Sequence, residues 1–354
     1  MRNAVIARDS AARAAAEAAI EAGGTALDAA LAGPLAGATR ASAATLLGAG
    51  GILLAGTGVG AHFIDGRARA PGLGEKRPRT PEAPPATWTA AVPGLLEAVL
   101  AAHLRFGTLA LTTVVRLAMS AVREEGTDAP LRARIKLVER LRRTGLSALE
   151  DMGVLQGILQ TAGPVVGGVF TKEDLVPVAA PVIALASCTN GTDEVLVPPR
   201  GVPWRGPNVP PELPLAPVES VLTADKNGVM CAASWVVAPE AAPVEGVAGL
   251  SLASLVPVPK KAVTRWRPGG ALPSPIPLAI VLTQGRAWGA MALAGKGPLV
   301  AARDAIVSAR LAQGGVDVSL GDRVGVPPLS PDAVVLWAVR EDEGDDVRAT
   351  MTAP

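Results

Sequence analysis

Apolar residues recur at helical spacing in several parts of the chain. Residues 5–7 predict a first strand, after which Asp9 or Ser10 is placed to cap an alanine-rich helix ending at Gly23-Gly24. Further helices are expected over residues 26–32, 93–106, 112–122, 131–143 and 298–312.

Short runs of apolar and β-branched residues predict the strands. They cover residues 52–54, 62–64, 220–224, 229–237, 280–283, 288–294 and 334–339. The turn Asp225-Lys226-Asn227-Gly228 joins two of these runs, and Asn-Gly is a strong hairpin signal. Strands and helices come in blocks instead of strict alternation, which favours a layered α+β fold.

The segment SAATLLGAGGILLAGTGVG, residues 42–60, is apolar enough to suggest a membrane span. Its six glycines argue against that, because each weakens a helix by roughly 1 kcal/mol relative to alanine. A phosphate-binding loop would need a Gly-Lys-Ser/Thr sequence, and the segment has no lysine. We therefore expect no membrane span here, but a buried loop followed by a core strand.

Proline-rich stretches suggest how the chain is organised. Residues 71–86 predict a polar loop, and residues 195–217 predict an extended linker. The linker divides residues 1–194 from residues 218–340, and an acidic tail follows over residues 341–354. We expect the two main parts to form one intertwined domain.

Composition excludes several kinds of chemistry. The 354 residues include 33 Lys and Arg and 32 Asp and Glu, so the net charge is +1 and exerts no long-range attraction on nucleic acid or anionic lipid. Two cysteines, two histidines and no tyrosine make a cysteine metal cage and Ser-His-Asp catalysis improbable. We expect no metal and no cofactor. The N-terminus lacks the apolar core of a signal peptide, so the expected compartment is the cytoplasm.

Two basic clusters are candidate interaction surfaces. The helix predicted over residues 131–143 carries six Lys and Arg side chains, and a second cluster comprises Lys260, Lys261, Arg265, Trp266 and Arg267. No aromatic residues interleave on the helix, so a solvated helix face is the simpler interpretation than a nucleic-acid surface. Docking of an acidic protein partner stays open as an alternative.

Several motifs occur in a characteristic order. They are VIARDSAARAAAEAAIEAGGTALDAALA at residues 5–32, LLGAGGILL at 46–54, DGRARAP at 65–71, AVPGLLEAVLAAHLRFGTLAL at 91–111 and FTKEDLVPV at 170–178. As an ordered set they resemble the gamma-glutamyltransferases (gamma-glutamyl transpeptidases), of which this chain would be a shortened and divergent member. The resemblance implies a four-layer αββα sandwich of the N-terminal nucleophile hydrolase type.

The same resemblance implies a catalytic threonine that is absent here. Members of this family cut themselves before a threonine, which then serves as the nucleophile and uses its own amine as base. Counting back from Asp225 places Val218 at that position, and a valine side chain has no lone pair with which to attack a carbonyl. An offset of one or two residues in this count would instead bring Ser220 or Thr223 forward.

The resemblance also assigns substrate-binding positions. Arg67 matches the arginine that holds a glutamate carboxylate in relatives, although the glutamate that follows it there is Ala68 here. The oxyanion donors would be Gly295 and Gly297, which Lys296 separates. The acids expected for the substrate amine are missing from residues 249–254.

Two functions are consistent with these residues. One is a gamma-glutamyltransferase-like protein without the nucleophile, kept as one unprocessed chain and acting as a non-catalytic subunit, a scaffold or a binder of a glutamyl-like small molecule. Its partner would be another protein or a second copy of itself. The alternative is a glutamyl or amide transferase or hydrolase with a displaced nucleophile at Ser220, Thr223 or Cys231.

Overall fold

Alternation of apolar side chains along the strands gives two sheets that bury one face against each other. The first sheet has the order β1 (Ala4–Ala7), β7 (Val218–Ala224), β8 (Val229–Val236), β2 (Gly50–Gly56), β3 (Gly60–Gly66) and β4 (Val182–Ile183). The second has the order β14 (Val347–Thr352), β13 (Val334–Arg340), β12 (Arg286–Ala294), β11 (Leu278–Thr283), β6 (Asp193–Val197) and β5 (Ala186–Asn190). All strand pairs in both sheets are antiparallel.

The structure is a computed structural model. It describes residues 3–74, 86–124, 128–145, 152–176, 180–183, 185–190, 193–199, 216–255, 268–272, 274–297, 299–300, 302–303, 330–340 and 347–352.

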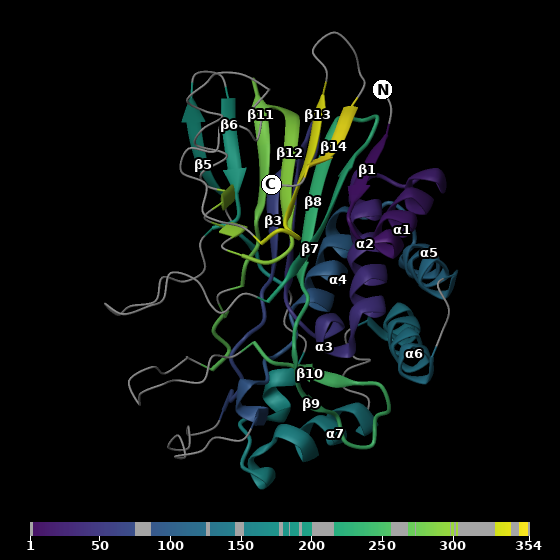
Figure 1. Cartoon of the computed structure of the whole chain (residues 1–354), viewed down its shortest axis with the longest axis vertical. Coiled ribbons are helices and arrows are strands. Elements are labelled where there is room, and N and C mark those ends of the chain that lie inside the picture. Colours follow the sequence, from purple (N-terminus) through teal and green to yellow (C-terminus); the bar gives the residue numbers. More distant parts are fainter. Residues whose placement is uncertain are drawn as a thin grey trace.

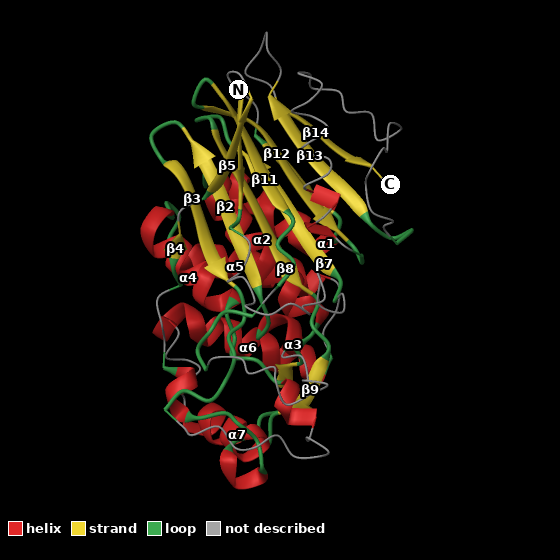
Figure 2. Cartoon of the chain, turned by 90° about the vertical axis from the view of Figure 1, so that its left-hand side faces the viewer, coloured by secondary structure: helices red, strands yellow, loops and turns green. Residues whose placement is uncertain are grey.

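Helices cover the outer face of the first sheet (Figures 1 and 2). They are α1 (Ser10–Glu21), α2 (Ala26–Ala41), α3 (Ala43–Leu46), α4 (Leu95–Phe106), α5 (Leu111–Glu124) and α6 (Ala129–Thr144). Helix α2 packs directly on β7 and β8, while α1, α5 and α6 pack on α2 from outside. A separate group at the foot of the molecule contains α7 (Met152–Ala162) and the two-stranded sheet of β9 (Glu240–Pro243) and β10 (Ser251–Ala253).

Helix α2 is buried between the first sheet and the outer helices. Every residue from Ala26 to Thr39 is buried, because the helix has neighbours on all sides. Small side chains permit this close approach: a Cβ on Gly37 would lie 2.5 Å from a ring carbon of Trp235 in β8. A second apolar layer fills the space between the sheets, where Phe63, Leu222 and Ile280 belong to one buried cluster.

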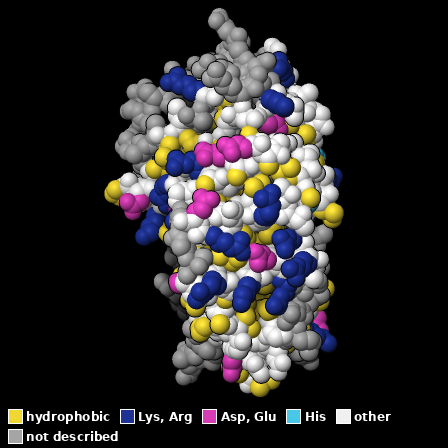
Figure 3. Space-filling view, turned by 90° about the vertical axis from the view of Figure 1, so that its right-hand side faces the viewer, with side chains coloured by type: hydrophobic (Ala, Val, Ile, Leu, Met, Phe, Trp, Pro, Cys, Tyr) yellow, Lys and Arg dark blue, Asp and Glu magenta, His cyan; other side chains and the backbone are white. Residues whose placement is uncertain are grey.

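Helices α5 and α6 are amphipathic, and α6 is the predicted basic helix. Its buried residues are Leu131, Ile135, Leu137, Val138 and Leu141, and its opposite side faces solvent. Lys and Arg side chains gather over this helical face of the molecule (Figure 3). The other predicted basic cluster, between Lys260 and Arg267, lies outside the described residues.

The predicted α+β sandwich is confirmed, and the glycine-rich segment forms α3 and the central strand β2. Within the described part of the chain, no helix has the length and apolar character needed to cross a bilayer. Three layers of the expected αββα order are described, with the helix predicted over residues 298–312 falling mostly outside the described residues.

Some boundaries differ from the sequence prediction. Helix α2 continues to Ala41 instead of ending near residue 32, because its packing on both sides outweighs the helix-breaking tendency of Gly33 and Pro34. Strand β6 begins at Asp193 and so includes the first residues assigned to the linker, and β14 occupies residues assigned to the acidic tail. Both strands form because a neighbouring strand satisfies their backbone groups.

Candidate functional site

Val218 is the first residue of β7, an inner strand of the first sheet. Its side chain is fully buried, and its register partner on β8 is Val236. The Val218 N–H donates to the Gly295 oxygen at 2.8 Å, and the Gly295 N–H donates to the Val218 oxygen at 2.7 Å. This isolated antiparallel bridge joins the head of β7 to the end of β12, in the other sheet.

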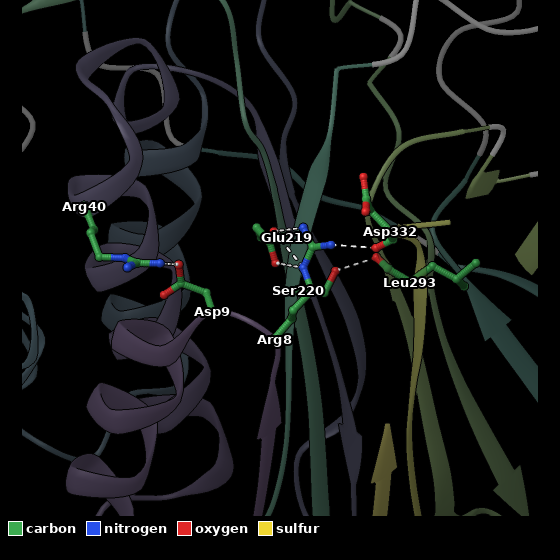
Figure 4. A network of polar contacts seen from close by, with 7 residues as sticks. All are labelled: Arg8, Asp9, Arg40, Glu219, Ser220, Leu293 and Asp332. Carbon is green, nitrogen blue, oxygen red and sulfur yellow. Dashed lines mark hydrogen bonds and ion pairs between the residues drawn. The ribbon is translucent and has the colours of Figure 1, made fainter. Parts of the chain in front are cut away.

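Glu219, the next residue, belongs to a network of polar contacts (Figure 4). Arg8 Nε lies 3.1 and 3.2 Å from the two carboxylate oxygens of Glu219, and a terminal guanidinium nitrogen of Arg8 also donates to this carboxylate. The other terminal guanidinium nitrogen of Arg8 donates to the main-chain oxygen of Asp332 at 2.7 Å. Burial raises the pKa of Glu219, whereas Arg8 opposes that rise. The network therefore holds the chain after β1, the start of β7 and the segment before β13 together.

Ser220 and Thr223 are buried and turn their hydroxyls to main-chain oxygens. The Ser220 hydroxyl donates to the oxygen of Leu293 in the second sheet at 2.9 Å. The Thr223 hydroxyl donates to the oxygen of Ala26, at the start of α2, at 2.6 Å. Both side chains have 0% exposure, so each hydroxyl connects layers of the sandwich.

Cys231 lies on β8 in the core next to α2. The thiol is fully buried, and burial raises its pKa well above the usual range, with Asp225 adding to the effect. Because the thiolate is the nucleophilic form of cysteine, this environment suits a packed side chain rather than an attacking group.

Arg67 follows β3 and is held by a neighbour in its own chain. Its Nε lies 2.8 and 3.0 Å from the two carboxylate oxygens of Asp65, and its main-chain N–H donates to the same carboxylate at 3.0 Å. Both side chains are only 7% exposed. Arg67 thus already has a carboxylate partner, and an incoming carboxylate would have to compete with Asp65.

The strand register places Arg67 and Val218 at the same end of the first sheet. Val218 pairs with Val236, Gly50 pairs with Trp235, and Gly66 pairs with Gly50. The two sites are also connected by packing, because Val218, Ala68 and Ala70 belong to one buried apolar cluster. The sheet end that carries Val218 is therefore filled with apolar side chains, most of them Ala, Val and Leu.

A second ion pair lies beside the first and was not predicted from the sequence. Arg69 contacts Glu97 of α4 at 2.6 Å, and the side chains are 15% and 11% exposed. Burial raises the pKa of Glu97 to about 7, although Arg69 works in the opposite direction. The Arg69 Nε is buried without a hydrogen-bond partner among the described residues. The Arg-Ala-Arg spacing was the only available sequence signal, and it does not identify Glu97.

Gly295 and Gly297 both have backbone conformations that favour glycine, with φ of +119° and +126°. A Cβ at Gly295 would lie 2.5 Å from the Cα of Ala333. Its N–H is engaged by Val218, and the Gly297 oxygen accepts from Leu299 at 2.9 Å. In this structure the Gly295 N–H stabilises the junction of the sheets and is not turned toward a ligand.

An open hollow lies away from these residues, between the start of α6 and the β9–β10 loop. Its volume is about 610 Å³, and Arg134, Glu240 and Ser251 contribute polar groups to its lining. The guanidinium of Arg134 is directed at the end of α2, where Nε donates to the Thr39 oxygen at 2.7 Å. Arg134 therefore caps a helix end, which favours a cation there.

The described residues contain no cluster of three or more His, Cys, Asp and Glu side chains able to hold a metal ion.

Solved structures share the architecture of this chain. The cephalosporin acylase from Bacillus halodurans aligns with 99% of this chain and 94% of its own, with a TM-score of 0.67 and 14% identity. A structure named LmbA2991T421A aligns with 99% of this chain and 96% of its own, with a TM-score of 0.71 and 15% identity. At such identities the likeness shows the fold alone.

A sequence-based family model matches part of the chain. The model described as Gamma-glutamyltranspeptidase matches residues 12–152, which include the glycine-rich segment and the motif around Arg67. This part of the chain is similar to the gamma-glutamyltranspeptidase family. No curated protein matches it in sequence.

Proposed function

We propose that this chain is a gamma-glutamyltransferase-like protein that lacks the nucleophile and performs no glutamyl transfer. It remains one unprocessed cytoplasmic chain and acts as a subunit, scaffold or binder of a small molecule. The single observation that carries the proposal is the environment of Val218. Val218, the first residue of an inner strand, has a fully buried aliphatic side chain. Its main-chain N–H and its main-chain oxygen are both hydrogen-bonded to Gly295.

The positions that would surround a reacting group also support this proposal. Nucleophilic catalysis of this type needs a hydroxyl and an amine that can act as its base. At Val218 the side chain has no hydroxyl, and the nitrogen already donates to Gly295. Its register partner on β8, Val236, is also aliphatic.

The alternative with a displaced nucleophile has less support. Ser220 and Thr223 each donate to a main-chain oxygen in the core, and Cys231 is buried with a raised thiol pKa. Any of them would need the layers of the sandwich to separate before a substrate could reach it.

The first experiment is intact mass spectrometry of the full chain purified from its expression host. We expect a single species of 35.7 kDa. Two fragments that meet near Pro217 would overturn the proposal that the chain stays unprocessed.

The second experiment measures turnover of a chromogenic γ-glutamyl amide at high protein concentration. We expect no release of chromophore above the blank for the wild-type chain and the same result for Ser220→Ala. Turnover that Ser220→Ala abolishes would establish the alternative. As a test of the position itself, Val218→Thr restores the missing hydroxyl, and self-cleavage before this threonine would show that valine alone silences the site.

A further inference from the structure

We propose that the basic outer surface of α5 and α6 binds the acidic segment at residues 341–346 of a second copy of the chain. We call this the basic surface and define it by six exposed side chains: Arg116, Arg123, Arg132, Lys136, Arg140 and Arg143. The inference does not depend on whether Val218 is a silenced catalytic position.

The spacing of the basic residues on α6 gives them a common direction. Arg132, Lys136, Arg140 and Arg143 follow one another at intervals of four, four and three residues, so they form one stripe along the helix. At a rise of 1.5 Å per residue, the stripe is about 16 Å long. The opposite side of α6, which includes Ile135 and Val138, is buried.

Helix α5 extends the positive charge beside this stripe. It packs against α6 and exposes Arg116 and Arg123. Arg123 contacts Glu139 of α6 at 2.5 Å, so one carboxylate already binds a guanidinium on this surface. Figure 3 shows the concentration of Lys and Arg on this side of the molecule. With a net charge of only +1 for the whole chain, this surface must be balanced by acids elsewhere.

The sequence contains one segment of matching opposite charge. Residues 341–346 read EDEGDD and carry five carboxylates, the densest acidic run in the chain. Arginine binds carboxylates well because its planar guanidinium can donate two parallel hydrogen bonds. Helices α5 and α6 contain no aromatic residue on which a base could stack, which disfavours single-stranded nucleic acid as the occupant.

The fold separates the two surfaces within one chain. The acidic segment connects β13 to β14 in the second sheet, whereas α6 lies in the helical layer beyond the first sheet. The first sheet and α2 lie between β13–β14 and α6, and stacked sheets are about 10 Å apart, so the flanking strands are more than one layer away from the basic surface of the same chain. The acidic segment therefore meets the basic surface of another copy, and a two-fold axis would repeat the contact twice.

The test is sedimentation equilibrium of the purified full chain at about 20 mM and about 500 mM salt, because exposed charge pairs are screened over this range. We expect a dimer at low salt whose dissociation constant rises at least about tenfold at high salt. The variant Arg132→Glu/Lys136→Glu should be monomeric at both salt concentrations. The matched control Arg105→Glu/Lys172→Glu changes the net charge equally at exposed positions away from the basic surface and should still dimerise.

A mixing experiment identifies the acidic segment. The variant Glu341→Gln/Asp342→Asn/Glu343→Gln should be monomeric alone, yet a mixture with Arg132→Glu/Lys136→Glu should associate, because one basic surface and one acidic segment remain intact. Circular dichroism should show that all variants keep the wild-type helix content. A wild-type chain that is monomeric at both salt concentrations, a dimer insensitive to these changes, or a mixture that stays monomeric would overturn the proposal. So would binding of RNA or anionic vesicles by the basic surface without self-association.

Discussion

Val218 and Gly295 exchange two backbone hydrogen bonds, of 2.8 and 2.7 Å, across the two sheets of the sandwich. The bridge lies at the position where the resemblance to gamma-glutamyltransferases places an attacking group. A valine at the head of β7, an engaged glycine opposite it and a surrounding aliphatic cluster together make this end of the sandwich a packed junction.

Gly295→Ala should destabilise the protein strongly. The residue has φ +119°, and the new Cβ would lie 2.5 Å from the Cα of Ala333, so the backbone itself must move. We expect the free energy of unfolding to fall by about 3 kcal/mol, measured by urea denaturation. Gly285→Ala is the matched control, since Gly285 has φ +76° with no atom within 4 Å of an added Cβ. Its cost should be only about 1 kcal/mol. Equal losses for the two variants would show that the junction tolerates movement.

Asp28→Asn should be destabilising although the side chains have the same shape. The buried Asp28 carboxylate accepts from the Thr25 and Thr108 N–H groups at 2.9 and 3.1 Å and from the Thr108 hydroxyl at 2.5 Å. In asparagine an NH2 group, which donates, replaces one of the two accepting oxygens. One of the buried donors around Asp28 would then face another donor instead of an acceptor. We expect a loss of about 3 kcal/mol in the free energy of unfolding. Glu17→Gln, an exposed charge removal on α1, should change it by less than about 0.5 kcal/mol.

Glu97 should make stability depend on pH. Burial raises its pKa from the ordinary value of 4.5 to about 7 in the folded chain, so between these pH values the folded state keeps a proton that the unfolded state has lost. The stabilisation is fully present below about pH 4.5 and is lost as the pH rises to about 7, amounting to about 3 kcal/mol.

Glu97→Gln should remove this pH dependence while keeping an acceptor for Arg69. The measurement is the free energy of unfolding by urea at several pH values between 4.5 and 8. A difference between wild type and variant that stays constant with pH would show that folding does not raise the pKa of Glu97.

Cys231 should resist thiol reagents in the native protein. Its side chain is fully buried, and burial raises its pKa, so both access and ionisation are disfavoured. In a Cys188→Ala background, a chromogenic disulfide should report no thiol in buffer and one thiol per chain in denaturant. Rapid reaction in buffer would instead support Cys231 as a displaced nucleophile.

Elements governed by local interactions were predictable from the sequence. Asp9 caps α1 by accepting from the Ala12 N–H at 2.8 Å, and the Asn-Gly turn joins β7 to β8 as expected. The ordered motifs also led correctly to the sandwich fold. These signals lie within a few residues of the structure they specify.

Elements governed by distant partners were not predictable. Strand β14 depends on β13 for its hydrogen bonds, and although its sequence VRATMT alternates apolar and polar residues, it directly follows an acidic run and was assigned to the tail. Arg8 and Glu219 are 211 residues apart in the chain, and neither position identifies the other before folding. Arg67 was singled out by its motif, but its partner Asp65 became evident only from the side-chain geometry.

The sequence by itself determined that residue 218 is aliphatic, because the identity of a side chain does not depend on folding, while the resemblance to gamma-glutamyltransferases predicts that this is the position of the nucleophile. It also determined the hairpin that carries Val218, since turn chemistry is local. Only the tertiary structure decided that Gly295 engages both main-chain groups of Val218, that Asp65 holds Arg67, and that Ser220 and Thr223 face main-chain oxygens. These contacts join segments from different layers, and they exist only once the two sheets and α2 have packed together.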